Sequence, residues 1–307
     1  MQNSTFSFED NDGFNIFVNK WAPDSGVIKG IIQLAHGMAG RSERWIHVAE
    51  ALTSAGYIVY ANDHRGHGLT AKEEKNLGII EPGGWAGCVG DLKQLLDIIK
   101  KENKDKPIFY IGFSWGSYMG QDLIQEYGEE YKGSIFLGTT GKKEKLFLLK
   151  LLLKIIIKKD GSNAKAHKLW DLAIKPFSEP FQPNKTDNDW RTSDLEVLKK
   201  FEADPLTGFI ETNGFFKGFG DGFSKIWNKK NEQKIPKNLP IYCLSGANDV
   251  TNHYTEDMLV LINRYKGYGI ADLSYKIYDG DVRHEIHNEK VKEEVFADII
   301  SWLDSHL

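Results

Sequence analysis

A serine with a glycine two places before it and two places after it is the first pattern here that could do chemistry. Gly112, Ser114 and Gly116 form G-x-S-x-G directly after the apolar run "PIFYIG". In this pattern a strand turns sharply into a helix and leaves the serine hydroxyl exposed as a nucleophile. Glycines on either side let the two backbones approach each other. Because the chain has 30 glycines, a loop serine beside two turn glycines is the alternative that further residues must exclude.

A serine nucleophile needs a base to take its proton and a carboxylate to orient that base. Asp249 follows the apolar run "IYCLSG", and His284 follows the run "LSYKIYDG". The carboxyl ends of parallel strands meet at one edge of a sheet, where ligands bind. The chain order serine, acid, histidine is also the order that accompanies G-x-S-x-G. The sequence therefore predicts Ser114, Asp249 and His284 as catalytic residues.

Other residues compete for the acid and base roles. Asp257, Asp279 and Asp281 lie near the predicted acid, but none stands at a strand tip with a full helix after it. His287 lies one helical turn beyond His284 and is expected at the surface or in support of the site. A zinc site formed by these two histidines is excluded, because "HEIH" does not have the H-E-x-x-H spacing.

Acyl transfer also needs two N–H donors for the oxyanion of the tetrahedral intermediate. One is the N–H of the residue after the nucleophile, and the other comes from a loop after an early strand. Trp115 supplies the first donor, and Met38 in "LAHGMAG" supplies the second. His36, in the same loop, is expected to be a buried structural histidine rather than a catalytic one.

Strand and helix patterns alternate along most of the chain. Residues 6–21 predict a β-hairpin around Asn11-Asp12-Gly13, and apolar runs then alternate with amphipathic segments up to residue 138. This alternation predicts an α/β fold with a mostly parallel sheet and helices on both faces. The range 141–235 has helical patterns and loops but no convincing strand. We expect a core of residues 1–140 and 236–307, with a helical cap at 141–235 inserted after the sixth strand.

Composition excludes several classes of protein. A net charge of −4 over 307 residues does not suggest nucleic acid as the main partner. The two cysteines, Cys88 and Cys243, fit neither a metal site nor a disulfide framework. The first residues show no export signal, and no apolar run reaches the ~20 residues that span a bilayer. We expect a cytoplasmic protein.

Five stretches together resemble the monoacylglycerol lipase/lysophospholipase branch of the α/β-hydrolases, often labelled serine aminopeptidase-like. They are "AHGMAGRSERW", "GYIVYANDHRGHG", "GFSWGSYMG", "SGANDV" and "RHEIHNE", and "WRTSDLEVLKKFEADPLTGF" resembles the cap of bacterial members. The resemblance covers nearly the whole chain. It implies the α/β-hydrolase fold and places the family's nucleophile, acid and base on Ser114, Asp249 and His284. Its oxyanion donors fall on Met38 and Trp115.

Three residues depart from the family pattern around the nucleophile. Phe113 stands where histidine is frequent, Trp115 where methionine is common, and Ser117 where a second glycine is usual. These changes bear on substrate shape more than on mechanism. The expected substrate is a small apolar carboxylic ester, such as a monoacylglycerol or lysophospholipid, cleaved without metal or organic cofactor. An aminopeptidase using the same triad and a non-catalytic ligand-binding protein are the alternatives.

The cap begins with an unusually apolar predicted helix, "KKEKLFLLKLLLKIIIKKDG". Lys150, Lys154 and Lys158 form a narrow stripe on an otherwise apolar surface. Such a helix is buried, self-associates, or contacts lipid, and its lysines suit an anionic membrane surface. These alternatives, and with them the oligomeric state, stay open. Most of the aromatic side chains of the cap are expected in its core, and some are expected to line the cavity over Ser114. They are Phe177, Phe181, Phe209, Phe215, Phe216, Phe219, Phe223 and Trp227.

Overall fold

The structure is a computed structural model that describes residues 1–141 and 146–307. For residues 146–149 it describes the backbone only. The strands are β1 Gln2–Glu9, β2 Asn15–Ala22, β3 Gly30–Ala35, β4 Tyr57–Asn62, β5 Ile108–Phe113, β6 Gly133–Leu137, β7 Ile241–Gly246 and β8 Leu273–Tyr278. The helices are α1 Ile46–Ser54, α2 Gly68–Ala71, α3 Gly84–Glu102, α4 Trp115–Tyr127, α5 Leu146–Asp160, α6 His167–Ala173, α7 Leu195–Ala203, α8 Asn213–Ile226, α9 Lys229–Glu232, α10 Glu256–Gly267 and α11 Lys292–Ser305. Short 3₁₀ turns lie at Ser42–Trp45, Glu74–Asn76, Gly128–Glu130, Lys175–Phe181, Val250–Asn252 and Ile286–Asn288.

The strands form one eight-stranded sheet in the order β1-β2-β4-β3-β5-β6-β7-β8. The predicted N-terminal hairpin is confirmed, since β1 and β2 pair antiparallel, and β2 also runs antiparallel to β4. All other neighbours are parallel. The predicted α/β class with a mostly parallel sheet is therefore confirmed. Among the described residues, no helix combines the length and the apolar character needed to cross a membrane.

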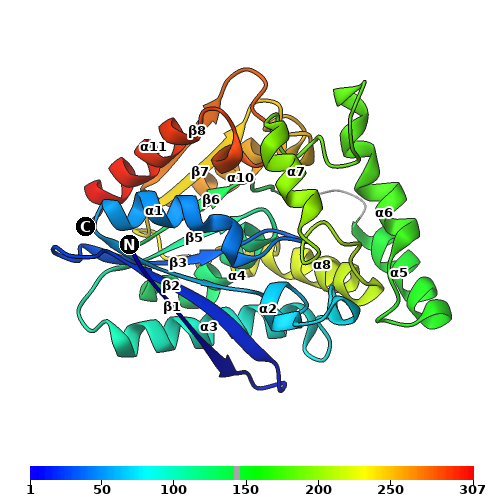
Figure 1. The fold of residues 1–307 in the computed structure, drawn as a ribbon, viewed down its shortest axis with the longest axis horizontal. Helices are drawn as coiled ribbons and strands as arrows, with labels where there is room; N and C mark the ends of the chain where they lie inside the picture. Colours follow the sequence, from blue (N-terminus) through cyan, green and yellow to red (C-terminus); the bar gives the residue numbers. More distant parts are fainter. Residues whose placement is uncertain (142–145) are drawn as a thin grey trace.

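Helices cover both faces of this sheet because side chains alternate along its buried strands. Along β5, Ile108 and Tyr110 join the core beneath α3 and α4, whereas Phe109 and Ile111 join the core beneath α1 and α11. All four are buried. Figure 1 shows α1 and α11 on one side of the sheet and α3 on the other. The central strands are thus buried on both faces, as continuous apolar runs predict.

The cap helices α5 to α9 lie between β6 and β7 along the chain. The helix α8 packs on α3 and α4 of the core and on α5 of the cap. The absence of a convincing strand in this range agrees with the structure, which has one isolated bridge there, between Lys165 and Thr212. The first residues of the predicted apolar helix, 142–145, lie outside the described residues. In Figure 1, α5 and α6 lie at the opposite end of the molecule from both chain termini.

Candidate active site

Ser114 stands at the sharp turn between β5 and α4. Its backbone angles, φ 49° and ψ −116°, lie in a region that residues with a side chain rarely adopt. A Cβ at Gly112 would come within 2.6 Å of the Gly116 carbonyl oxygen, and a Cβ at Gly116 within 2.2 Å of the Ala35 carbonyl oxygen. Close backbone approach therefore requires both glycines. This is the physical reason for the spacing seen in the sequence.

Hydrogen bonds hold the strained turn in place. The Ser114 N–H donates to the Leu137 carbonyl of β6 at 2.9 Å. The Ser114 carbonyl accepts from the Tyr118 N–H at 3.1 Å and from the Ser117 hydroxyl at 2.6 Å. Ser117, one of the departures from the family pattern, thus closes the first turn of α4. The backbone around the candidate nucleophile is fixed from the strand side and from the helix side.

His284 and Asp249 meet beside this turn. The Nδ1 atom of His284 lies 2.8 Å from Oδ2 of Asp249, and both side chains are buried. The other carboxylate oxygen, Oδ1, accepts from the Thr251 N–H at 2.9 Å and from the Thr251 hydroxyl at 2.7 Å. Because a carboxylate only accepts, Nδ1 carries the proton and Nε2 is left as the basic nitrogen of a neutral ring. An Asx turn directly after β7 therefore aims the carboxylate at the histidine.

The competing acidic residues have other partners. Asp281 accepts from Asn248 and Arg283, and Asp257 contacts His253. Asp279 is exposed. Among the candidate acids, Asp249 is the one whose carboxylate bonds His284 in the structure.

The sequence also predicted positions for two further histidines, His36 and His287. His36 is buried, with Nε2 accepting from the His64 N–H and Nδ1 donating to the Gly37 carbonyl, as expected of a structural histidine. Burial holds its pKa well below the ordinary value. The surface alternative for His287 is wrong: its ring is buried and stacks on Trp45 with centroids 3.9 Å apart. It is instead packed near the site, because "EIHN" forms a 3₁₀ turn that folds back into the core.

The two candidate oxyanion donors come from segments next to the nucleophile. Trp115 is the first residue of α4, where a backbone N–H has no acceptor within the helix. Met38 follows Gly37, whose Cβ position would lie 2.8 Å from the Phe113 ring and 3.2 Å from the Ser114 Cβ. The loop that carries Met38 can come this close to the nucleophile because residue 37 has no side chain.

Ser114 and His284 line one cavity of about 210 Å³. Most of its wall is apolar and comes from the cap. Its lining residues are Met38, Ser114, Tyr118, Leu169, Ala173, Ile174, Phe177, Trp190, Phe216, Phe219, Phe223, Thr251 and His284. Some of the cap aromatics line the cavity, as expected: Phe177, Phe216, Phe219 and Phe223. The last three share one face of α8. No carboxylate is among the described residues that line it.

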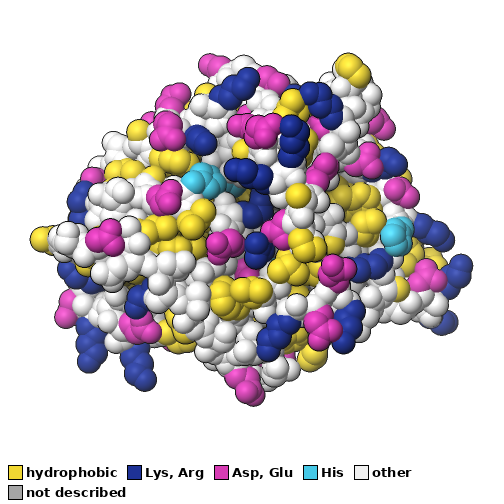
Figure 2. All heavy atoms as spheres, in the orientation of Figure 1, with side chains coloured by type: hydrophobic (Ala, Val, Ile, Leu, Met, Phe, Trp, Pro, Cys, Tyr) yellow, Lys and Arg dark blue, Asp and Glu magenta, His cyan; other side chains and the backbone are white. Residues whose placement is uncertain are grey.

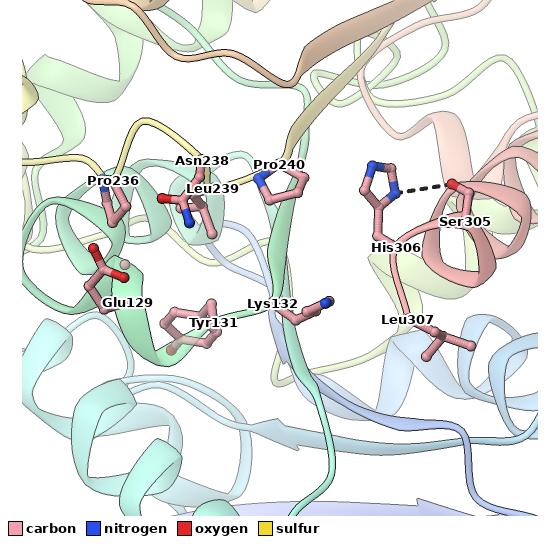
Figure 3. Close-up of a pocket in the computed structure, with 11 residues that line it drawn as sticks. Glu129, Tyr131, Lys132, Pro236, Asn238, Leu239, Pro240, Ser305, His306 and Leu307 are labelled. Atoms are coloured by element: carbon pink, nitrogen blue, oxygen red, sulfur yellow. Dashed lines mark hydrogen bonds between the residues drawn. The ribbon is translucent and has the colours of Figure 1, made fainter.

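A larger cavity of about 400 Å³ lies at the opposite edge of the sheet. Figure 3 shows its wall, formed by Glu129, Lys132 and Pro240 near the starts of β6 and β7, facing Ser305 and His306 at the end of α11. A serine, a histidine and an acid also meet here, since His306 Nε2 lies 3.0 Å from an Asp272 oxygen.

This second constellation has no base. The His306 Nδ1 atom lies 2.6 Å from the Trp302 carbonyl oxygen, which can only accept, so Nδ1 carries a proton. The Ser305 hydroxyl donates to that carbonyl at 2.8 Å and lies 3.0 Å from His306 Nδ1, the contact drawn as a dashed line in Figure 3. The nitrogen that faces Ser305 is thus a donor to the Trp302 carbonyl and cannot take the serine proton. The cavity that contains Ser114 is therefore the candidate active site.

Comparison with known proteins identifies the family of the chain. Residues 26–291 match the family model described as "Serine aminopeptidase, S33". The chain belongs to this family. A monoacylglycerol lipase from Mycolicibacterium smegmatis is 27% identical over 309 residues, covering 99% of this chain and 98% of the relative. The human monoglyceride lipase is 25% identical, covering 95% of this chain and 88% of that protein.

A solved structure is similar over the same extent. The crystal structure of a thermostable carboxyl esterase from Bacillus coagulans, in complex with glycerol, has a TM-score of 0.91 and 29% identity, covering 99% of each chain. The predicted α/β-hydrolase fold and the monoacylglycerol lipase branch are thereby confirmed. The same matches support the predicted enzyme class, a carboxylic ester hydrolase.

Sequence reasoning missed several residues around the site. Thr251 holds the Asp249 carboxylate and also lies 3.0 Å from His284 Nδ1 through its hydroxyl. Its place two residues after the acid is typical of an Asx turn, so this signal was present. Trp190 packs against the His284 ring with centroids 5.4 Å apart. It comes from a cap loop, and no local pattern marked it.

Proposed function

We propose that this protein is a serine hydrolase that cleaves carboxylic esters with an apolar acyl chain, of the monoacylglycerol type. One observation carries the proposal. Ser114 and His284 open into the same apolar cavity, with Asp249 bonded behind the histidine. The relatives named monoacylglycerol lipase and the esterase solved with glycerol support the ester class.

In the proposed mechanism, the Ser114 hydroxyl attacks the ester carbonyl while His284 Nε2 takes its proton. Asp249 keeps the ring in the required tautomer and stabilises the imidazolium that forms. The N–H groups of Met38 and Trp115 receive the oxyanion. His284 then protonates the leaving alcohol, and an acyl-enzyme remains on Ser114. Water, activated by the same histidine, releases the acid.

The lining and the volume of the cavity favour an apolar acyl chain of limited length. Pockets for drug-sized ligands have volumes of roughly 300–1,000 Å³. The cavity here holds about 210 Å³ and is walled by aromatic rings from the cap. We therefore propose that residues 141–235 act as a cap that closes over the acyl chain. Short and medium acyl chains should fit this cavity better than long ones.

The same cavity disfavours the aminopeptidase alternative. A substrate with a free α-amino group carries an ammonium that needs an acceptor or a carboxylate when it is buried. The described residues of the lining include no Asp or Glu. Turnover of monoacylglycerols and of aminoacyl amides by the same preparation, with Ser114→Ala as the blank, tests the assignment. We expect ester turnover that falls by about 10⁶ in the variant. Turnover of the amides in preference to the esters would contradict the proposal.

We also propose that α5 brings the cap to anionic membrane surfaces. Burial covers only one face of this helix: Leu153 is buried, whereas Leu151, Leu152 and Ile155 are 50%, 39% and 62% exposed. The wholly buried alternative is therefore wrong for the single chain. Figure 2 shows Lys and Arg side chains along the edge of the molecule where α5 lies in Figure 1. An exposed apolar face flanked by lysines is typical of helices that lie on lipid.

A further inference from the structure

The cap holds both polar groups of Ala39, the residue that follows the candidate oxyanion donor Met38. The Ala39 carbonyl accepts from the Gly208 N–H at 2.9 Å. The Ala39 N–H points at Oε1 of Glu211, 3.2 Å away. Ala39 has a φ of 52°, in the left-handed region that an alanine adopts only at a cost. Two cap residues thus hold this loop in a conformation it would not favour alone.

Glu211 is itself firmly placed. Its side chain is fully buried, and its backbone carbonyl accepts from the Ala166 N–H at 2.8 Å. The next residue, Thr212, donates its hydroxyl to the Gly78 carbonyl of the core at 2.6 Å. Because these hydrogen bonds fix residues 211 and 212, the Glu211 carboxylate has little freedom to follow a moving loop. The loop must instead conform to the carboxylate.

The positions of the protons around His67 determine which atom accepts the hydrogen bond from the Ala39 N–H. The His67 Nδ1 atom lies 3.0 Å from the Arg65 carbonyl oxygen, so Nδ1 carries a proton. His67 Nε2 lies 3.0 Å from Glu211 Oε1, a contact that needs one proton between the two atoms. Whether this proton is bonded to His67 or to Glu211, it lies between the two atoms, so Nε2 cannot accept a second hydrogen bond. Only Oε1 keeps a lone pair for Ala39, although Nε2 is equally near at 3.2 Å.

We propose that Glu211 is a positioning residue for the oxyanion hole. It fixes the peptide that follows Met38, so that the Met38 N–H stays where the oxyanion develops. The inference rests on the proposed function. It also makes the segment 208–211 the fixed side of the cap, which must stay in place during turnover.

The variant Glu211→Gln tests this inference at constant side-chain volume. A neutral amide cannot share a proton with His67, so Nε2 then competes with Oε1 for the Ala39 N–H, and the charge-assisted bond that fixes the loop is lost. Mispositioned oxyanion donors weaken transition-state binding but not substrate binding. We expect kcat for a short soluble ester to fall at least tenfold while KM changes less than twofold. The inhibition constant of a trifluoromethyl ketone should rise by the same factor as kcat/KM falls.

The variant Glu232→Gln is the matched control. Glu232 is another fully buried glutamate, but it pairs with Arg264 and joins α9 to α10 away from Ser114. It should lower the melting temperature and leave kcat within twofold of wild type. If Glu211→Gln does not fold, Glu211→Asp is the second variant. It keeps the negative charge but shortens the side chain by one methylene, so the carboxylate no longer reaches the Ala39 N–H. It should lower kcat with KM unchanged.

The outcomes separate this inference from the proposed function. A folded Glu211→Gln or Glu211→Asp protein with wild-type kcat and wild-type affinity for the ketone overturns the positioning role. An equal loss of kcat in Glu232→Gln also overturns it, because the loss would then reflect general destabilisation. A folded wild-type protein that hydrolyses no ester contradicts the proposed function instead.

Discussion

His284 and Asp249 are 35 residues apart in the chain, yet His284 Nδ1 lies 2.8 Å from a carboxylate oxygen of Asp249. They come together because β7 and β8 are adjacent parallel strands whose carboxyl ends meet at one edge of the sheet. The turn that carries Ser114 emerges at the same edge, after β5. The candidate site is thus a product of sheet topology.

The variant Asp249→Asn should lower kcat by about 10⁴, because an amide in this place favours the wrong histidine tautomer. Steady-state kinetics on a soluble ester measures the loss. Asp281→Asn is the control: Asp281 is a half-exposed carboxylate that bonds Asn248 and Arg283, and its loss should change kcat by less than threefold. A larger loss at Asp281 than at Asp249 would overturn the assignment of the acid.

Removing one ring from the acyl cavity should shift the chain-length preference. The variant Phe219→Ala enlarges the cavity next to Phe216 and Phe223 on the same face of α8. We expect kcat/KM to rise for long-chain p-nitrophenyl esters relative to the butyrate. Phe6→Ala, which removes a ring that packs on Tyr60 at the edge hairpin, should leave the ratio unchanged. An unchanged ratio in Phe219→Ala would show that the acyl chain binds elsewhere.

Co-sedimentation with anionic vesicles tests the proposed docking of α5. The exposed apolar side chain of Ile155 and the exposed lysines Lys154 and Lys158 should contact the lipid surface. Each lysine near the surface contributes about 1 kcal/mol, which salt reduces. Lys154→Gln with Lys158→Gln, or Ile155→Asp alone, should weaken pelleting. Turnover of a short soluble ester should stay nearly unchanged.

The control for this experiment is Leu153→Asp, because Leu153 is the buried residue of the same helix. It should lower the melting temperature, whereas Ile155→Asp should not. Wild-type protein that stays in the supernatant at low salt would contradict the docking proposal. An oligomer that Ile155→Asp dissociates would show that the exposed face binds a second copy.

Stability should fall in acid partly through Glu285. Burial alone would raise the pKa of this carboxyl, but the guanidinium groups of Arg44 and Arg191 outweigh burial and hold the pKa well below its ordinary value. Because the pKa in the folded state lies below the value of about 4.3 in the unfolded state, the ionised carboxylate stabilises the fold above that pH. This stabilisation is lost as the pH falls further. The variant Glu285→Gln should therefore melt well below wild type at pH 7.

The difference in melting temperature between wild type and Glu285→Gln should narrow between pH 5 and pH 3. Thermal melts across this range measure it. A difference that stays constant down to pH 3 would show that Glu285 contributes no charge-dependent stability.

The sequence predicted the turn at Ser114, the alternation of strands and helices along the chain and a mostly parallel sheet, but not the order of the strands within it. The turn at Ser114 depends on Gly112 and Gly116, whose need is visible within five residues. The position of Asp249 depends on a strand end, which apolar runs mark. Sheet edges then bring these pieces together by a general rule of parallel sheets.

The remaining features depend on packing between distant segments, which local patterns do not encode. Glu211 reaches Ala39 across 172 residues of sequence, and no spacing marks either residue. His287 was given a surface alternative because its burial depends on stacking against Trp45. On α5, the same apolar run gives a buried Leu153 and an exposed Ile155, and only the position of α8 decides which face is covered.

The most direct test of the account is the intact mass of the protein after treatment with an alkyl fluorophosphonate. This reagent phosphonylates an activated serine and spares ordinary serines, including Ser305 in the second constellation. We predict that wild-type protein gains the mass of one phosphonyl group, that Ser305→Ala gains it as well, and that Ser114→Ala gains none. A label on folded Ser114→Ala, or no label on folded wild type, would contradict the assignment of Ser114 as the nucleophile.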